Sequence, residues 1–168
     1  MSRVAAICLT MMFGAAGGLT AGAADLPKEG KFSVTFFATG TSKGVAVGKT
    51  RYQSSFEYDG FTVGEGLLDH VTFHCTGMNG RRDQTRHVVN FCVLTDKDGD
   101  QIAQDIEESF PNGTKIIRGT GKLVAGTGKY EGISGEFEFE NQGSGFRAGT
   151  DDRFFNYGKT EGQYQLPK

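Results

Sequence analysis

The sequence predicts an all-β fold, built as a single eight-stranded antiparallel barrel. Three observations support this prediction. Apolar and polar residues alternate with a period of two along most of the chain, which is typical of strands with one buried face. Glycine-rich segments that favour turns separate these runs. No window of a dozen residues has convincing helical periodicity, and the best helical candidate, Gln101–Ser109, is short and also fits a strand.

Eight runs have the alternating pattern. The clearest is Gly135–Asn141, in which Phe137 and Phe139 alternate with glutamates and are expected to face the core. The predicted strands are Lys31–Thr41, Arg51–Tyr58, His70–Thr76, Arg86–Thr95, Gln101–Ile106, Lys115–Ala125, Gly135–Asn141 and Lys159–Leu166.

The segments between these runs supply the turns. The predicted turns are Gly40–Gly44, Asp59–Gly60, Met78–Asp83, Asp98–Asp100, Asn112–Gly113 and Gly143–Gly145. A meander of eight strands can close on itself, which removes its exposed edges. A two-sheet sandwich is the alternative that the same pattern allows. Because no internal repeat and no linker are visible, residues 25–168 are predicted to form one domain.

The first 24 residues have the features of a secretory signal peptide. Arg3 precedes the apolar run Val4–Met12, and the small residues of Ala21–Ala24 offer cleavage after Ala23 or after Ala24. The apolar run is short and is followed by glycines, so a transmembrane anchor is disfavoured. We therefore expect a periplasmic or secreted protein without a membrane span.

The charge balance excludes an electrostatic footprint for nucleic acid. The chain has 18 basic and 20 acidic side chains and a formal charge of −2. Glycine is the outlier, with 26 of 168 residues, whereas tryptophan is absent. Fourteen phenylalanines and five tyrosines supply the bulk of a core, and their spread along the chain argues against disorder.

Cys75 and Cys92 are the cysteines that remain after the predicted cleavage. In an oxidising compartment, two cysteines most simply form one disulfide. They lie in neighbouring predicted strands, and a hairpin that turns through Met78–Asp83 would bring them opposite each other. A reactive thiol pair and metal ligation are the alternatives, but the sequence has no C-x-x-C pair and no second pair of ligands.

The segment Asp96–Asp100 begins like an EF-hand calcium loop, with Glu107 at the twelfth place. The sixth place is Gln101 instead of the required glycine, and the preceding residues form a strand rather than a helix. A hairpin turn is therefore favoured, and weak calcium binding by Asp96, Asp98 and Asp100 stays open. The glycine–lysine segments at 119–122 and 126–129 do not match a phosphate-binding loop. No cofactor and no metal are predicted.

The segment Ala125–Gly135 is the most specific in the chain. It resembles the G-G-T-G-x-[FY]-x-G-x-x-G signature of the allene oxide cyclase and dirigent barrel group. In a tight connection of this kind, glycines permit positive φ angles and the aromatic residue, here Tyr130, caps the barrel. Cys92–Asp100 is similar to a hairpin found in exported bacterial relatives of the group.

The resemblance implies an eight-stranded antiparallel barrel with an apolar central cavity, often assembled as a homotrimer. In that group, the cyclases bind an unsaturated fatty-acid epoxide and the dirigent proteins guide coupling of phenolic radicals. Phe36–Gly44 carries no carboxylate where the cyclases have a catalytic glutamate, so no catalytic residue is assigned.

Three functions are consistent with an exported barrel. The first is binding of a small apolar or aromatic molecule in its interior. The second is an isomerase or cyclase-type activity, which requires an ionisable side chain that faces inward. The third is a non-catalytic envelope interaction module with a filled barrel, acting through the exposed stripe of Glu136, Glu138 and Glu140. For the first function, the expected ligand-binding residues are Tyr52, Phe56, Tyr58, Phe73, Phe137 and Phe139, with His74 as a polar contact.

Overall fold

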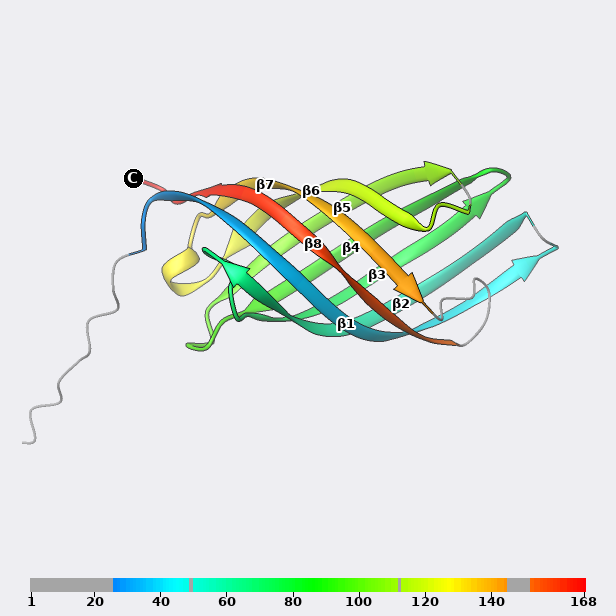
Figure 1. The fold of residues 1–168 in the computed structure, drawn as a ribbon, viewed down its shortest axis with the longest axis horizontal. Coiled ribbons are helices and arrows are strands. Elements are labelled where there is room, and N and C mark those ends of the chain that lie inside the picture. The colour runs from blue at the N-terminus through cyan, green and yellow to red at the C-terminus, as the bar shows by residue number, and fades with distance from the viewer. Residues whose placement is uncertain (1–25, 49, 112, 145–151) are drawn as a thin grey trace, which may run out of the picture.

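The computed structural model describes residues 26–48, 50–111, 113–144 and 152–168, which form a closed antiparallel barrel of eight strands (Figure 1). Each strand pairs with the next one in sequence, and the last pairs back with the first. A short 3-10 helix, η1, lies between the sixth and seventh strands. The strands are β1 (Glu29–Val47), β2 (Arg51–Glu65), β3 (Thr72–Arg82), β4 (Thr85–Thr95), β5 (Gln101–Pro111), β6 (Ile116–Gly126), β7 (Ser134–Ser144) and β8 (Asp152–Gln165), with η1 at Gly128–Tyr130.

The predicted fold class is confirmed. Pairing between β1 and β8 runs from Glu29↔Gln165 to Ser42↔Asp152, so the sheet has no free edge there. The sandwich alternative is therefore wrong. Residues 101–111, which include the best helical candidate, form strand β5. No described helix is long and apolar enough to cross a membrane.

Two of the predicted glycine turns are wrong. Gly40 lies inside β1 and Gly60 lies inside β2, and the two strands pair without interruption from Ser33↔Glu65 to Val47↔Arg51. These glycines face the interior, where aromatic side chains need space: a Cβ at Gly60 would lie 2.4 Å from Cζ of Phe73. The glycines therefore make room for rings and do not turn the chain.

The hairpin between β3 and β4 is longer than predicted. The turn lies at 83–84, with Asp83 at φ 57°, and the residues from Met78 to Arg82 belong to β3. The predicted pairing of the cysteines is confirmed, because Cys75 lies opposite Cys92 and the two form a disulfide. The strand predicted from His70 begins instead at Thr72, since His70 is in a turn with φ 55°.

The predicted turns nearer the C-terminus differ in outcome. Gly99 and Gly113 have positive φ angles of 88° and 84°, in connections that flank β5. Gly143 belongs to β7, whereas Gly145 lies outside the described residues. The predicted signal peptide at 1–24 and its cleavage sites also lie outside the described residues.

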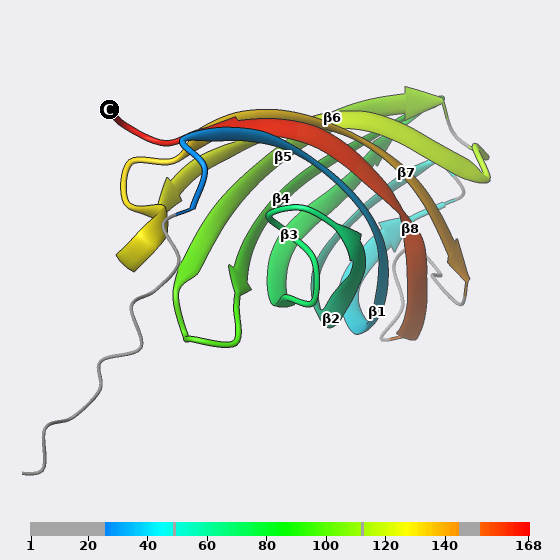
Figure 2. The same ribbon diagram turned by 60° about the vertical axis from the view of Figure 1, so that its left-hand side comes forward.

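One end of the barrel is filled by side chains. The connection between β2 and β3 folds inward across this end (Figure 2), which buries Leu67, Leu68 and Val71. Thr62 holds the connection in place, because its Oγ1 donates to the Leu68 carbonyl and accepts from the Val71 amide at 3.2 Å. Other residues of the buried core include Phe32, Ile102, Leu123, Tyr130, Ile133 and Tyr164.

The β6–β7 connection docks against the β4–β5 turn at the same end. Tyr130 donates a hydrogen bond to the Asp96 carboxylate at 2.9 Å. The Lys129 ammonium contacts Asp96 and lies 2.7 Å from Asp98 and 3.7 Å from Asp100. Burial of Asp96 opposes its ionisation, but hydrogen bonds from Lys129 and Tyr130 outweigh it and lower its pKa to about 2. The ammonium thus occupies the space between carboxylates in which a calcium ion would have to bind.

The connection has the backbone geometry that its glycines predict. Gly128 and Gly132 have φ angles of 54° and 75°. A side chain at Gly128 would also collide with Asp100, whose Oδ1 lies 1.9 Å from the position of a Cβ. The segment that resembles the dirigent and allene oxide cyclase signature is therefore a tight connection between two strands, as expected.

Candidate functional site: a cavity inside the barrel

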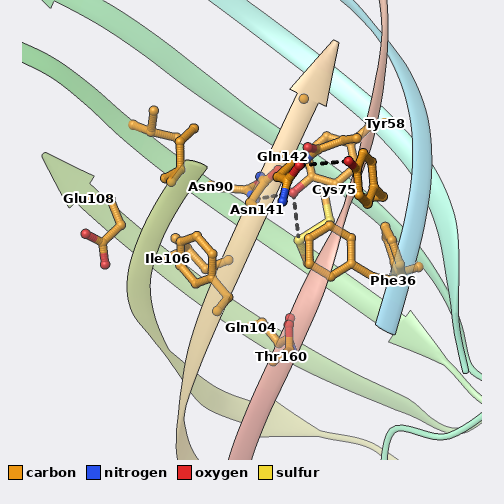
Figure 3. Close-up of a pocket in the computed structure, with 18 of the residues that line it drawn as sticks. Phe36, Tyr58, Cys75, Asn90, Gln104, Ile106, Glu108, Asn141, Gln142 and Thr160 are labelled. Atoms are coloured by element: carbon orange, nitrogen blue, oxygen red, sulfur yellow. Dashed lines mark hydrogen bonds between the residues drawn. A yellow bond between two sulfur atoms is a disulfide. The ribbon is translucent and has the colours of Figure 1, made fainter. Parts of the chain in front are cut away.

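The barrel encloses a cavity of about 580 Å³, and all eight strands contribute to its wall (Figure 3). Its inner boundary is formed by residues that also belong to the filled end, such as Val34, Leu68 and Leu94. Its outer part is lined by Phe110, Thr114, Lys115 and Ile117, from the end at which β5 leads into β6. A cavity of this size can hold a drug-sized molecule.

Aromatic rings form much of one side of the wall. Tyr58 lies at the centre of this group, with edge-to-face contacts to Phe73 and Phe154 at centroid distances of 6.1 and 6.0 Å. Phe56 stacks on Tyr58 at 5.9 Å, and Phe36 contacts Phe73 edge to face at 6.5 Å. Such pairs stabilise each other beyond the area that they bury. The group therefore gives the cavity a rigid apolar surface.

The Tyr58 hydroxyl is a polar group within this apolar wall. It accepts a hydrogen bond from Nδ2 of Asn90. It also lies 3.7 Å from the Sγ of Cys92, and since this sulfur is part of a disulfide, the hydroxyl is the donor in that contact. Burial raises the pKa of Tyr58 to about 12, so the phenol stays neutral at physiological pH.

Two amide oxygens beside the cavity are unpaired. Oδ1 of Asn90 and Oδ1 of Asn141 are shielded from solvent and have no hydrogen-bond partner among the described residues, and both residues line the cavity. Asn90 is on β4, whereas Asn141 is on β7 and follows Phe137 and Phe139 on the inner face. Buried acceptors without a donor are uncommon and call for an explanation.

A cationic side chain lines the outer part of the cavity. Nε of Arg86 donates to Oδ1 of Asn79 at 3.3 Å, and the guanidinium lies 5.2 Å from the centroid of the Phe110 ring. The Tyr52 hydroxyl donates to the same Asn79 oxygen at 3.2 Å. Burial lowers the pKa of Arg86, although the group stays charged at neutral pH. This cluster fixes the guanidinium against an aromatic ring.

A carboxylate also faces the cavity, at a break in the barrel wall. Pairing between β5 and β6 ends at Ile106↔Gly121. Beyond that point, Oε1 of Glu108 accepts the Thr120 amide at 2.6 Å and takes the place of a strand–strand hydrogen bond. Gly119 makes this possible, since a Cβ there would lie 2.2 Å from the Glu108 carboxyl carbon. Glu108 is thus an ionisable group on the cavity wall.

Comparisons with known proteins give one informative result. Neither a protein family nor a curated protein matches this chain. Among solved structures, a dirigent protein that is a pterocarpan synthase matches with a TM-score of 0.52 at 12% identity, over 84% of this chain and 88% of that one. The fold is that of a dirigent-type barrel. At this identity, the similarity concerns the fold and not the activity.

Most of the predicted ligand-binding residues lie on the cavity wall of the dirigent-type barrel. These are Phe56, Tyr58, Phe73, Phe137 and Phe139. Tyr52 is half-buried and lies beside the lining residue Asn79, to which it is hydrogen bonded. Whether these residues bind a ligand stays a prediction.

The prediction that His74 contacts a ligand in the interior is wrong. Its neighbours Phe73 and Cys75 are buried, and because side chains alternate along a strand, His74 points to the outside. Its Nδ1 lies 2.8 Å from the Asp59 carboxylate on the outer surface, and more than half of its side chain is exposed.

Several wall residues were not identified from the sequence. They are Phe36, Arg86, Asn90, Glu108 and Asn141. Asn141 could have been found, because it continues the inward series of Phe137 and Phe139. Glu108 could not, since the predicted strand ended at Ile106 and nothing in the sequence marks where β5 and β6 separate.

The glutamate stripe of β7 lies on the outer face of the barrel, opposite in direction to Phe137 and Phe139. Glu140 forms an ion pair with Arg118 at 2.8 Å. Glu136 is opposite Lys122 in the neighbouring strand. The stripe is therefore interleaved with basic side chains.

Proposed function

We propose that this chain is an exported dirigent-type barrel that binds a small apolar or aromatic molecule in its interior. The observation that carries the proposal is the cavity of about 580 Å³, whose wall combines a cluster of aromatic rings with a few polar groups. This composition is typical of small-molecule sites, in which apolar surface supplies affinity and polar groups set orientation.

The cavity also suits a ligand because its shape is already formed. The rings of Phe56, Tyr58, Phe73 and Phe154 hold one another in place, so little ordering is needed on binding. A molecule with a flat or compact apolar body would replace water next to these rings. The proposal therefore favours uncharged, ring-containing ligands.

Export is supported by the predicted signal peptide at 1–24 and by the Cys75–Cys92 disulfide, which suits an oxidising compartment. The corresponding localisation is the periplasm or the extracellular medium. Fractionation of cells that express the full chain tests this, with N-terminal sequencing of the product. A product that begins at Ala24 or Asp25 supports export, and an uncleaved cytoplasmic product contradicts it.

A binding titration tests the ligand proposal. The probe is N-phenyl-1-naphthylamine, whose fluorescence rises in apolar surroundings. Ile106→Trp would fill the cavity, because Ile106 lines it, whereas Val89→Trp adds the same ring on the exposed face of β4. We expect saturable binding to the wild type and to Val89→Trp, and at least tenfold weaker binding to Ile106→Trp. Equal binding by all three proteins would contradict a site in the cavity.

An isomerase or cyclase-type enzyme is the second candidate. It is favoured by the ionisable groups on the cavity wall, Glu108 and Tyr58. If the barrel converts its ligand, a ligand recovered after incubation has the same mass but a different chromatographic retention. Glu108→Gln would then abolish the conversion and leave binding in place. Recovery of an unchanged ligand would contradict this candidate.

A non-catalytic envelope interaction module is the third candidate, through the stripe of Glu136, Glu138 and Glu140. A cavity of this size counts against it, because that hypothesis assumed a filled barrel. The homotrimer implied by the resemblance also stays a proposal. Sedimentation equilibrium tests it, with a mass of three chains as the supporting result and a monomer mass as the contradicting one.

A further inference from the structure

The side-chain amide of Gln104 lies in the deep part of the cavity. We propose that this amide binds an uncharged polar group of the ligand, a hydroxyl or a carbonyl, so that the ligand enters the barrel with this group first. The inference rests on the proposed function, since it assumes that the cavity binds a ligand, and it adds where the polar end of that ligand lies.

Gln104 is in β5 and its side chain is directed into the barrel. It is 7% exposed, whereas the next residue along the strand, Asp105, is exposed on the outer face. Gln104 lines the cavity and is one of the residues labelled in Figure 3. Phe110, in the outer part of the same cavity, follows six residues later, about 20 Å along the strand. Gln104 therefore belongs to the deep part of the cavity.

The Gln104 amide is unpaired but open to the cavity. It makes no hydrogen bond within the part of the chain that the structure describes, and neither of its polar atoms is shielded from solvent, in contrast to Oδ1 of Asn90. Because the side chain is almost fully buried and lines the cavity, the space that these atoms contact is the cavity itself. A molecule inside the barrel can therefore reach both the donor and the acceptor of this amide.

The neighbours of Gln104 on the inner face are apolar. In the strand register it lies opposite Cys92 of β4 and Leu123 of β6. The inward residues before and after it in β5 are Ile102 and Ile106. A primary amide in such surroundings lowers stability unless something in the cavity hydrogen bonds to it. None of these four neighbours carries a charge, so a ligand carboxylate or ammonium would be buried beside them without a counterion, and the position suits an uncharged polar group.

An irregularity of the sheet lies at the same position. The register between β5 and β6 shifts between Ala103 and Gln104. Gln104 pairs with Leu123, and Val124 is the extra residue of β6. Bulges of this kind are over-represented next to active sites, where they change the direction of a side chain. The bulge is therefore a second feature, independent of the unpaired amide, that favours a binding role for this part of β5.

Two naphthalenes of nearly equal size test the inference. They are 2-naphthylmethanol and 2-ethylnaphthalene, which differ by a hydroxyl in place of a methyl group. Affinities are measured at pH 7 by displacement of N-phenyl-1-naphthylamine. Gln104→Met removes the amide and keeps the length of the side chain. Ile106→Met places the same side chain at the next inward position of β5 and is the matched control.

The expected result is a change in selectivity that is confined to one variant. In Gln104→Met, the ratio of the Kd of the alcohol to the Kd of the ethyl compound should be about tenfold higher than in the wild type, which corresponds to the loss of one hydrogen bond. In Ile106→Met, this ratio should equal that of the wild type. Gln104→Met should unfold at the same or a higher urea concentration than the wild type, because the amide contributes no internal hydrogen bond.

The outcomes separate the two proposals. An unchanged ratio in Gln104→Met, equal loss of both compounds included, would overturn the inference and leave ligand binding intact. The same change of ratio in Ile106→Met would also overturn it. A Gln104→Met protein that unfolds at clearly lower urea concentration would do so too, because the amide would then have a structural role. If the wild type binds neither compound, the proposed function is contradicted as well.

Discussion

The Glu108 carboxylate accepts a hydrogen bond from the Thr120 amide at 2.6 Å, across the gap where β5 and β6 no longer pair. The side chain thus completes the barrel wall at a point where the backbone does not. It has this position because Gly119 leaves room for the carboxyl group. The break in the wall lies directly beside the cavity.

Removal of this carboxylate should loosen the β5–β6 seam. In Glu108→Ala, the Thr120 amide loses its acceptor, and we expect its hydrogen exchange to accelerate together with a loss of roughly 1 kcal/mol in the free energy of unfolding. Exchange is followed in peptides that cover residues 116–121. Glu107→Ala, on the outer face of the same strand, is the control. Unchanged exchange in Glu108→Ala would show that the seam does not depend on this bond.

The ion pair at the filled end should make the fold sensitive to acid. The pKa of Asp96 is about 2 in the folded protein, below its ordinary value of 3.8. A lowered pKa means that the carboxylate stabilises the fold above pH 4, and this contribution is lost as the pH falls from about 4 to 2. We expect Asp96→Asn to lower the free energy of unfolding at pH 7 by about 1–2 kcal/mol.

Urea unfolding at pH 7 and at pH 2 measures this effect. The difference between wild type and Asp96→Asn should be clear at pH 7 and should shrink at pH 2, where about half of the Asp96 side chains are protonated. Asp105→Asn, at an exposed position of β5, should not change either midpoint. A constant difference between wild type and Asp96→Asn at both pH values would contradict the assigned role.

The disulfide should contribute a large part of the stability. It joins residues 17 positions apart, and a crosslink over a loop of this length stabilises a protein by about 3 kcal/mol in the chain-entropy model. We therefore expect Cys75→Ala/Cys92→Ala to unfold at lower denaturant concentration. A reducing agent should shift the wild type in the same direction and leave the double variant unchanged. A reducing agent that does not affect the wild type would contradict this prediction.

The inward glycines should tolerate substitution much less well than the others. A Cβ at Gly77 would lie 2.4 Å from Cζ of Phe56 and 2.4 Å from the Val89 carbonyl, whereas a Cβ at Gly80 on the same strand meets nothing closer than 3.9 Å. We expect Gly77→Ala to cost about 1–3 kcal/mol and Gly80→Ala to be neutral or slightly stabilising. Thermal unfolding of the two variants compares them directly, and equal transition temperatures would contradict the space-filling role of Gly77.

Much of the fold follows from local patterns. Alternation in Gly135–Asn141 predicts which face of β7 is buried, because side chains of a strand point to opposite sides. The same reasoning places Phe56, Tyr58 and Phe73 on the inner face and brings Cys75 opposite Cys92. This reasoning fails at Gly40 and Gly60. The local sequence suggests a turn at each glycine, but in the folded barrel each one leaves room for an aromatic ring.

The sequence by itself determined that this chain forms strands with an aromatic inner face, one disulfide and a tight connection at Ala125–Gly135, because these features depend on neighbours along the chain. Only the tertiary structure decided that side chains fill one end of the barrel and that the barrel encloses a cavity beyond that end. It also decided that Asn90, Asn141 and Glu108 all line the cavity. The reason is that a cavity depends on which side chains face each other across the barrel, and strand closure sets those distances.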